Sequence, residues 1–167
     1  MSTTTTSDSK LSAHARSVID HWIKKYPADR KQSAVLAALR EAQHENHGHL
    51  TVELMDAVAA YLGMPKIAVY EVASFYSMLE TRPCGRHSIS VCTNISCMLC
   101  GADEIVAHIE KKLGIKTGES TRDGRFYLKR EEECLAACCG GPMMMVDHVY
   151  HEKLTPARVD AILDKLE

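Results

Sequence analysis

This sequence of 167 residues has little excess charge of either sign and no long apolar run. Its formal net charge is −2, which leaves no positive surplus to attract a nucleic-acid backbone, so we expect no nucleic-acid partner. No apolar stretch approaches the roughly 20 residues that a membrane-spanning helix needs, so we expect no direct membrane insertion. The hydrophobic share of 46% and the charged share of 25% are typical of a soluble globular protein.

The sequence also lacks nucleotide-binding and targeting motifs. It contains no G-x-G-x-x-G and no P-loop, so we predict that it binds no dinucleotide by itself. Its first residues, MSTTTTSD, lack the basic and apolar segments of a secretory signal, and its first arginine is Arg16, unlike a mitochondrial transit peptide. We expect residues 1–10 to form a disordered tail and the protein to be cytoplasmic.

Apolar residues recur at helical spacing in four segments between residues 11 and 80. The first segment ends before Pro27, and Thr51 is a candidate N-cap of the third. Gly63 stands where a C-terminal glycine belongs, and Pro65 can open the fourth helix. These signals predict a helical bundle domain over residues 11–80.

The pattern changes near residues 81–85, where we place the domain boundary. Alternation in HSISVC predicts a strand over residues 87–92, and a helical stripe follows over residues 98–113. Further on we predict strands at 119–121 and 125–132, a hairpin of 143–146 with 149–151, and a last helix capped by Thr155. The order β-α-β-β-β-α predicts a small α/β domain over residues 85–167, so the fold class is α+β.

The chain has seven cysteines, a high and odd number; six lie in this predicted domain, and Cys84 lies in the connector just before it. In a reducing compartment such cysteines more often bind metal or do redox chemistry than form disulfides. Cys92-x4-Cys97 follows the first predicted strand, and Cys134-x3-Cys138 lies in a loop bounded by Gly and Pro. Both loops can lie at one end of the sheet, and two thiolate pairs suit the two irons of a [2Fe–2S] cluster. We therefore predict these four cysteines as the metal ligands.

The spacing leaves other sites open. Cys92-x4-Cys97-x2-Cys100 also matches the opening of plant-type ferredoxins, although we expect Cys100 to lie inside the helix of 98–113 and to point away from Cys97. A structural Zn(Cys)4 site uses the same donors, but its C-x2-C spacing occurs in neither pair. Cys97 and Cys100 together form the C-x-x-C of a redox dithiol. We expect Cys84 and Cys139 to be bystanders.

Two further groups draw attention. The histidines of HENHGH, at positions 44, 47 and 49, could bind a metal, but at the end of a helix they indicate a solvated turn. Met143, Met144 and Met145 suggest a copper site, but within a strand they are more typical of core packing, with Met143 and Met145 on one face.

Four stretches of the chain resemble the family of the 24 kDa (E) subunit of respiratory complex I, NADH:quinone oxidoreductase. They are YLGMPKIAVYEVASFYSML, CTNISCMLCGADEI, GIKTGESTRDGRFYL and ECLAACCGGPMMMVDHVYHEKLTP. The likeness covers nearly all of the chain from Tyr26 onward. Members of this family are thioredoxin-like [2Fe–2S] ferredoxins, which implies a helical bundle followed by a thioredoxin-like domain. The motifs C-x4-C and C-x3-C ligate the family's cluster, which implies the same four cysteines.

The resemblance implies an electron-transfer subunit that holds one [2Fe–2S] cluster near the FMN of a partner flavoprotein subunit (F). That partner would bind FMN and NADH, so this chain alone would hold no complete active site. The resemblance also implies the large iron–sulfur subunit (G) as a partner and a peripheral place on the cytoplasmic face of a bacterial inner membrane. Small subunits of NAD-dependent formate dehydrogenases and bidirectional hydrogenases use the same module, so these contexts stay open.

Overall fold

The computed structural model describes residues 10–130 and 134–166. Contacts divide the chain into two compact units, Met1–Pro83 and Cys84–Glu167. Helices make up the first unit and a mixed α/β layer the second, which confirms the predicted α+β class. The predicted tail, apart from Lys10, lies outside the described residues. Within the described part of the chain, no helix combines the length and the apolarity needed to cross a bilayer.

The helical unit contains α1 (Ala13–Ile23), the 3-10 helix η2 (Ala28–Ala34), α2 (Val35–Glu45), α3 (Val52–Leu62) and α4 (Lys66–Phe75). The Thr51 side chain accepts a hydrogen bond from the Leu54 N–H over 3.3 Å, so it caps α3 as predicted. Gly63 ends that helix in the left-handed conformation, with φ of 67°, which a glycine adopts without strain. The helix η2 was not predicted, because its polar residues carry no apolar period.

Aliphatic side chains from every helix of this unit meet in one core. Its largest fully buried members are Ile19, Leu39, Leu50, Leu62 and Val58. Small alanines such as Ala15, Ala38 and Ala57 let neighbouring helices approach closely. The helical bundle is therefore held by ordinary apolar burial.

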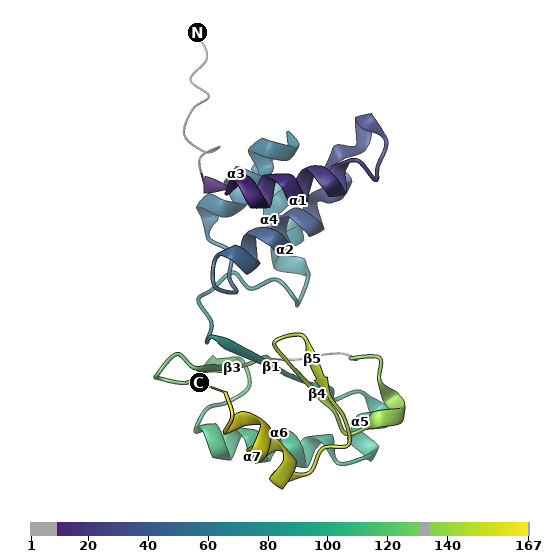
Figure 1. The fold of residues 1–167 in the computed structure, drawn as a ribbon, viewed down its shortest axis with the longest axis vertical. Coiled ribbons are helices and arrows are strands. Elements are labelled where there is room, and N and C mark those ends of the chain that lie inside the picture. The colour runs from purple at the N-terminus through teal and green to yellow at the C-terminus, as the bar shows by residue number, and fades with distance from the viewer. Residues whose placement is uncertain (1–9, 131–133, 167) are drawn as a thin grey trace. The chain divides into compact units, whose positions relative to one another are not determined.

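The second unit is built on one sheet of order β2-β3-β1-β4-β5 (Figure 1). Its strands are β1 (His87–Val91), β2 (Glu119–Ser120), β3 (Phe126–Leu128), β4 (Met144–Val146) and β5 (Val149–His151). Strand β1 pairs in parallel with β3, with Ser88 opposite Tyr127, while the other neighbours are antiparallel. The predicted hairpin at 143–151 is confirmed.

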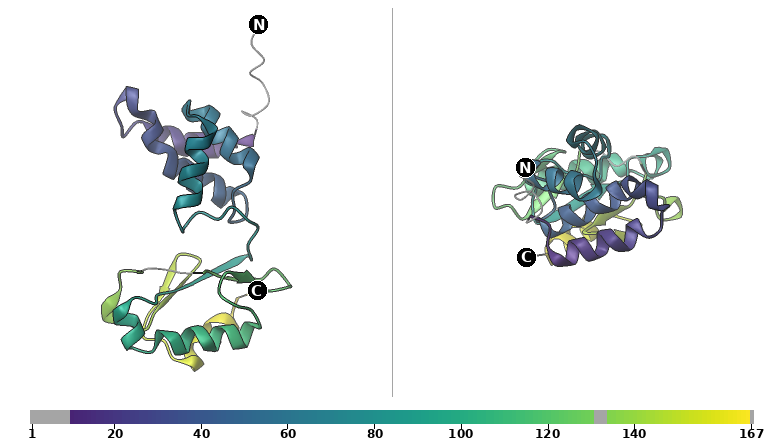
Figure 2. Two further views of the ribbon diagram at one scale, coloured as in Figure 1. Left: turned by 180° about the vertical axis from the view of Figure 1, so that it is seen from behind. Right: turned by 90° about the horizontal axis from the view of Figure 1, so that it is seen from above.

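Helices cover one face of this sheet. Figures 1 and 2 show α6 (Ala102–Leu113) and α7 (Pro156–Leu163) on the same side of the strands. Ile105 and Ile109 of α6, together with Val159 and Leu163 of α7, pack into the aliphatic core around Phe126. Thr155 caps α7 and Pro156 opens it, as predicted.

The predicted helix over residues 98–113 is wrong at its start. Helix α5 (Ile95–Leu99) begins before residue 98 and has Cys100 as its C-cap, and α6 begins only at Ala102. Gly101 separates the two helices with φ of 90°, a conformation that breaks a helix. The apolar pattern runs across this break, so periodicity alone could not reveal it.

Candidate metal centre

The first cysteine pair lies at the end of β1 and in the helix that follows. Cys92 directly follows the strand, and its N–H donates to the Met143 carbonyl oxygen on the neighbouring chain segment over 3.1 Å. Cys97 lies in α5, and its side chain turns inward from an otherwise exposed helix. The exposed fraction is only 2% for Cys92 and 1% for Cys97, so this pair forms the buried side of the site.

The second pair lies in the loop before β4. Cys134 precedes a turn in which Ala136 takes a positive φ of 57°, and the Ala136 N–H donates to the Cys134 sulfur over 3.3 Å. Cys138 begins the short 3-10 helix η3 (Cys138–Gly140). Both side chains are exposed, so this pair forms the open side of the site. Figure 1 shows this light-green loop beside α5.

The sulfur of Cys92 joins the two loops. It accepts hydrogen bonds from the backbone N–H groups of Leu135 and Asn94 and from the thiols of Cys97 and Cys134. Burial alone would raise the pKa of the Cys92 thiol, but these donors outweigh it and hold the pKa below its ordinary value. The site therefore stabilises a thiolate at Cys92, the form that binds a metal.

Cys97 has the opposite electrostatic environment. Burial, the hydrogen bond to Cys92 and the negative charge on Cys92 together raise the pKa of the Cys97 thiol to about 11. The backbone N–H of Met143 opposes this by donating to the Cys97 sulfur, and Cys138 adds to the repulsion. In the absence of a metal cation, only part of this sulfur set can carry charge, as expected of thiols held close together.

The remaining cysteines occupy different places. Cys100 caps α5 and is exposed, Cys139 is exposed next to Cys138, and Cys84 is half-buried at the start of the second unit. The expectation that Cys100 points away from Cys97 is wrong. A Cβ atom added to Gly141 would lie 3.4 Å from the Cys97 sulfur and 3.5 Å from the Cys100 sulfur, so both face this glycine.

The donor set fits a two-iron cluster better than it fits zinc. All seven cysteines lie in the described residues and none of them forms a disulfide, yet no three of their sulfurs lie within 4.8 Å of one another. A Zn(Cys)4 site needs such a triad, because bonds of about 2.3 Å in a tetrahedron place its sulfurs about 3.8 Å apart. A two-iron cluster takes one pair of thiolates on each iron and needs no tight triad. Soft sulfur donors from two loops, with the Cys92 sulfur in contact with those of Cys97 and Cys134, match that requirement.

The geometry also argues against a redox dithiol. An activated thiol in a C-x-x-C motif has a lowered pKa and lies at the start of a helix. Cys97 lies in the middle of a helix of five residues, and its pKa is raised. Cys97 and Cys100 are close together, but neither the electrostatics nor the helix favours a nucleophile at Cys97.

Backbone N–H groups of the two stretches that surround the cysteine pairs, residues 93–97 and 135–139, donate to the sulfurs. Asn94, Leu135 and Ala136 donate from these stretches. Met143 lies outside both stretches and was missed, because only the fold brings it against Cys97. The peptide bond between Gly141 and Pro142 just before it is cis, which the sequence could not show.

The other two groups noted in the sequence have structural explanations. Met144 is buried in the core of the sheet, while Met143 and Met145 pack on the side of the cysteines, so the methionine run is packing. Residues 44–49 end α2, where the Asn46 side chain donates to the His49 carbonyl oxygen and His47 takes a positive φ of 54°. These histidines form a turn, as predicted.

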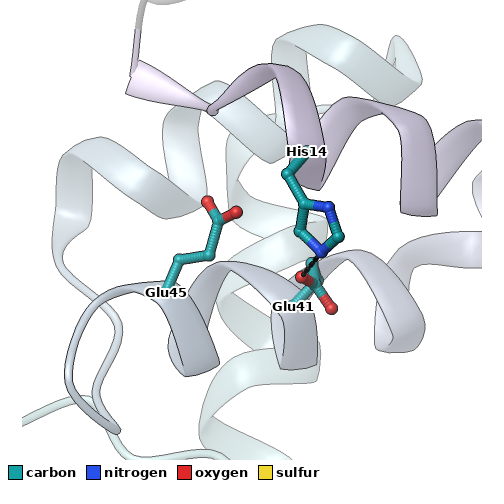
Figure 3. Close-up of side chains that lie close together, drawn as sticks. All are labelled: His14, Glu41 and Glu45. Carbon is teal, nitrogen blue, oxygen red and sulfur yellow. Dashed lines mark ion pairs between the residues drawn. The ribbon is translucent and has the colours of Figure 1, made fainter.

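A different group of possible metal ligands joins α1 to α2 (Figure 3). His14, Glu41 and Glu45 offer ligand atoms within 4.8 Å of one another. The His14 Nε2 lies 3.5 Å from a Glu41 oxygen, and Ser12 donates a hydrogen bond to Glu45 over 2.6 Å. Since polar partners within the bundle already account for all three side chains, we interpret the group as a surface contact between the helices.

Comparison with known proteins places the chain among relatives of similar length. It is 45% identical to the E subunit of NADH-quinone oxidoreductase from Rickettsia bellii over 150 residues, which cover 90% of this chain and 89% of the relative. It is 45% identical to the E 2 subunit of NADH-quinone oxidoreductase from Rhizobium meliloti over 149 residues, which cover 89% of this chain and 86% of the relative.

One region of a solved structure of an NAD+-reducing [NiFe]-hydrogenase in the air-oxidized state has a similar fold, with a TM-score of 0.66 at 22% identity. That match covers 78% of this chain but only 22% of the hydrogenase chain. The family model for the thioredoxin-like [2Fe-2S] ferredoxin matches residues 19–167, which is nearly the whole chain. Together with the relatives, this match shows that the chain belongs to the thioredoxin-like [2Fe–2S] ferredoxin family.

Proposed function

We propose that Cys92, Cys97, Cys134 and Cys138 hold one [2Fe–2S] cluster and that the protein transfers single electrons. One observation carries the proposal: the Cys92 sulfur contacts the thiols of Cys97 and Cys134, which come from two loops far apart in the sequence. Each loop supplies one pair of thiolates, as a two-iron cluster requires. When bound, such a cluster takes up and releases one electron at a time.

The chain itself supplies two things to this chemistry. Backbone N–H groups of Asn94, Leu135, Ala136 and Met143 point at sulfur atoms, so they stabilise the negative charge of the thiolates. The buried sulfurs of Cys92 and Cys97 are kept from water on one side, while Cys134 and Cys138 stay exposed on the other. We infer that electrons enter and leave on the exposed side.

The proposed context is NADH:quinone oxidoreductase, in which this chain would be the E subunit. Relatives at 45% identity carry that name and are subunits of a larger complex. We propose that a partner flavoprotein subunit (F) binds NADH and FMN, because this chain has no dinucleotide motif. The large iron–sulfur subunit (G) is the second proposed partner. The complex would lie on the cytoplasmic face of a bacterial inner membrane.

An exposed apolar rim beside the cysteines supports a partner at this site. Ile95 and Leu99 of α5 are 67% and 79% exposed, and Met98 is 45% exposed. Apolar side chains gathered next to a functional site are typical of a protein–protein interface. Covering this rim would also exclude water from the exposed side of the cluster.

Reduction by NADH tests the electron-transfer role and its dependence on the partner. We expect NADH to leave the visible spectrum of the isolated chain unchanged and dithionite to bleach it. After addition of the purified flavoprotein subunit, NADH should bleach the same bands. Bleaching by NADH without the partner would contradict the assignment of the nucleotide site, and no bleaching with the partner would contradict the proposed electron donor.

A further inference from the structure

Cys100 places a fifth thiol beside the proposed ligands. It caps α5 three residues after Cys97, and its N–H donates to the Cys97 carbonyl oxygen over 3.0 Å. Residues three apart on a helix are neighbours on its surface, so their side chains point in similar directions. The Cys100 side chain is exposed while that of Cys97 is buried, so its thiol has room to move.

Gly141 shows how close the two sulfurs lie. A Cβ atom added there would have as its nearest neighbours the Cys97 sulfur at 3.4 Å, the Cys100 sulfur at 3.5 Å and the Cys100 Cβ at 3.6 Å. Both sulfurs therefore lie against the same face of one glycine in the loop that carries Cys138. The fifth thiol is directed at the site.

The helix that carries both thiols is short and ends at a glycine. Helix α5 has five residues, and Gly101, with φ of 90°, separates it from α6. The two helices are separate elements, although the Ile105 N–H donates to the Gly101 carbonyl oxygen over 3.3 Å. Cys100 therefore lies at the end of the short helix and not inside α6, which packs into the core of the sheet.

On the basis of the proposed [2Fe–2S] site, we propose that Cys100 is a reserve ligand for the iron held by Cys97. When the Cys97 sulfur is lost, the Cys100 thiol releases its proton to solvent and its thiolate takes the same coordination position. The cluster then keeps four thiolate ligands. In the intact protein Cys97 remains the resident ligand, because its sulfur is the buried one in contact with Cys92.

The test uses the full chain purified without oxygen, as the wild type and as the variants Cys97→Ala, Cys100→Ala, Cys97→Ala/Cys100→Ala and Cys97→Ala/Cys139→Ala. Cys139 is the matched control, because it is also an exposed cysteine next to a proposed ligand. Iron, acid-labile sulfide, the visible spectrum and the EPR spectrum after reduction by dithionite are measured for each. Circular dichroism reports whether each variant folds, and a parallel Cys97→Ser series covers the case in which alanine disturbs the fold.

We expect Cys97→Ala to keep most of the iron and sulfide, with shifted visible and EPR spectra. The control Cys97→Ala/Cys139→Ala should give the same result as Cys97→Ala. The Cys97→Ala/Cys100→Ala variant should lose nearly all of the iron and nearly all of the sulfide. If Cys97→Ala loses its cluster as completely as that double variant, Cys100 is no reserve ligand. If Cys100→Ala alone loses the cluster, Cys100 binds the cluster in the intact protein, and the proposal that it is only a reserve ligand is wrong. A wild type without iron and sulfide would instead overturn the proposed function itself.

Discussion

The helical unit and the α/β unit differ in the kinds of side chain that they bury. Residues 1–83 contain no cysteine, and the core of the helical unit is made of aliphatic side chains and alanines. The α/β unit has an aliphatic core of its own beneath the sheet, around Phe126 and Ile109. Beside that core it has a second buried group, in which Cys92 and Cys97 pack with Leu135 and Met143.

From this difference we predict that the function of the sulfurs can be changed separately from the stability of the fold. The reactive sulfurs lie in loops and a short helix at the end of β1, outside the aliphatic core. Changes to the sulfurs should therefore affect the cluster more than the fold, and changes to either aliphatic core should affect stability more than the cluster. Each of the following variants tests one side of that separation.

Cys92→Ala should have the largest effect. Its sulfur is the one that contacts both loops, so iron, sulfide and visible absorption should be lost almost completely. The control is Cys84→Ala, a half-buried cysteine of the same unit, which should keep its cluster. A Cys92→Ala protein with wild-type iron and sulfide would contradict the claim that the cluster depends on this sulfur of the α/β unit.

Leu39→Ala should destabilise the helical unit by about 2–5 kcal/mol, because it removes a fully buried side chain and leaves a cavity. Urea unfolding followed by circular dichroism measures this loss. Leu36, which is only partly buried, provides the control, and Leu36→Ala should cost less. The visible spectrum of folded Leu39→Ala should equal that of the wild type. A bleached spectrum at low urea would mean that the two units are not energetically separate.

Thr51→Ala and Thr155→Ala form a matched pair across the two units. Each hydroxyl accepts a backbone hydrogen bond over 3.3 Å at the start of a helix. Loss of such an N-cap costs about 1 kcal/mol. We expect Thr51→Ala to shift only the unfolding of the helices, and Thr155→Ala to shift only the unfolding step at which the visible bands disappear. Equal effects of both variants on both steps would show a single cooperative transition.

Acid should have the smallest effect. Hydrogen bonds from His108 over 2.8 Å and Lys112 over 3.3 Å hold the pKa of Asp160 below the ordinary 3.8. Folding favours the carboxylate, so this contribution is fully present above pH 3.8 and is lost as the pH falls through the lower folded-state pKa. Asp160→Asn should reduce the acid dependence of the stability of the α/β unit. An unchanged acid dependence would show that these contacts, which lie near the surface, contribute nothing measurable.

Sequence reasoning predicted most of the helices and strands, because their signals are local. Thr51, Gly63 and Thr155 mark helix ends through their own backbone and side-chain chemistry, and alternation marked β1. The contact between Cys92 and Cys134 depends on two loops that are distant in the sequence. The cysteine spacing suggested that these loops meet, and the family resemblance supported the same prediction.

What the sequence could not predict depends on tertiary contact. The break at Gly101 lies inside an apolar period, and it leaves Cys100 at the end of α5 instead of inside α6. The Met143 N–H reaches Cys97 only because β4 pairs beside β1. Ala136 takes a positive φ without being a glycine, so its residue type gives no signal.

The most direct test of the central claim is the metal content and colour of the full chain purified without oxygen. We predict a red-brown protein with visible absorption, with iron and acid-labile sulfide in equal amounts and no stoichiometric zinc. A colourless protein that contains zinc without sulfide, or no metal at all, would contradict the claim that these four cysteines hold a [2Fe–2S] cluster.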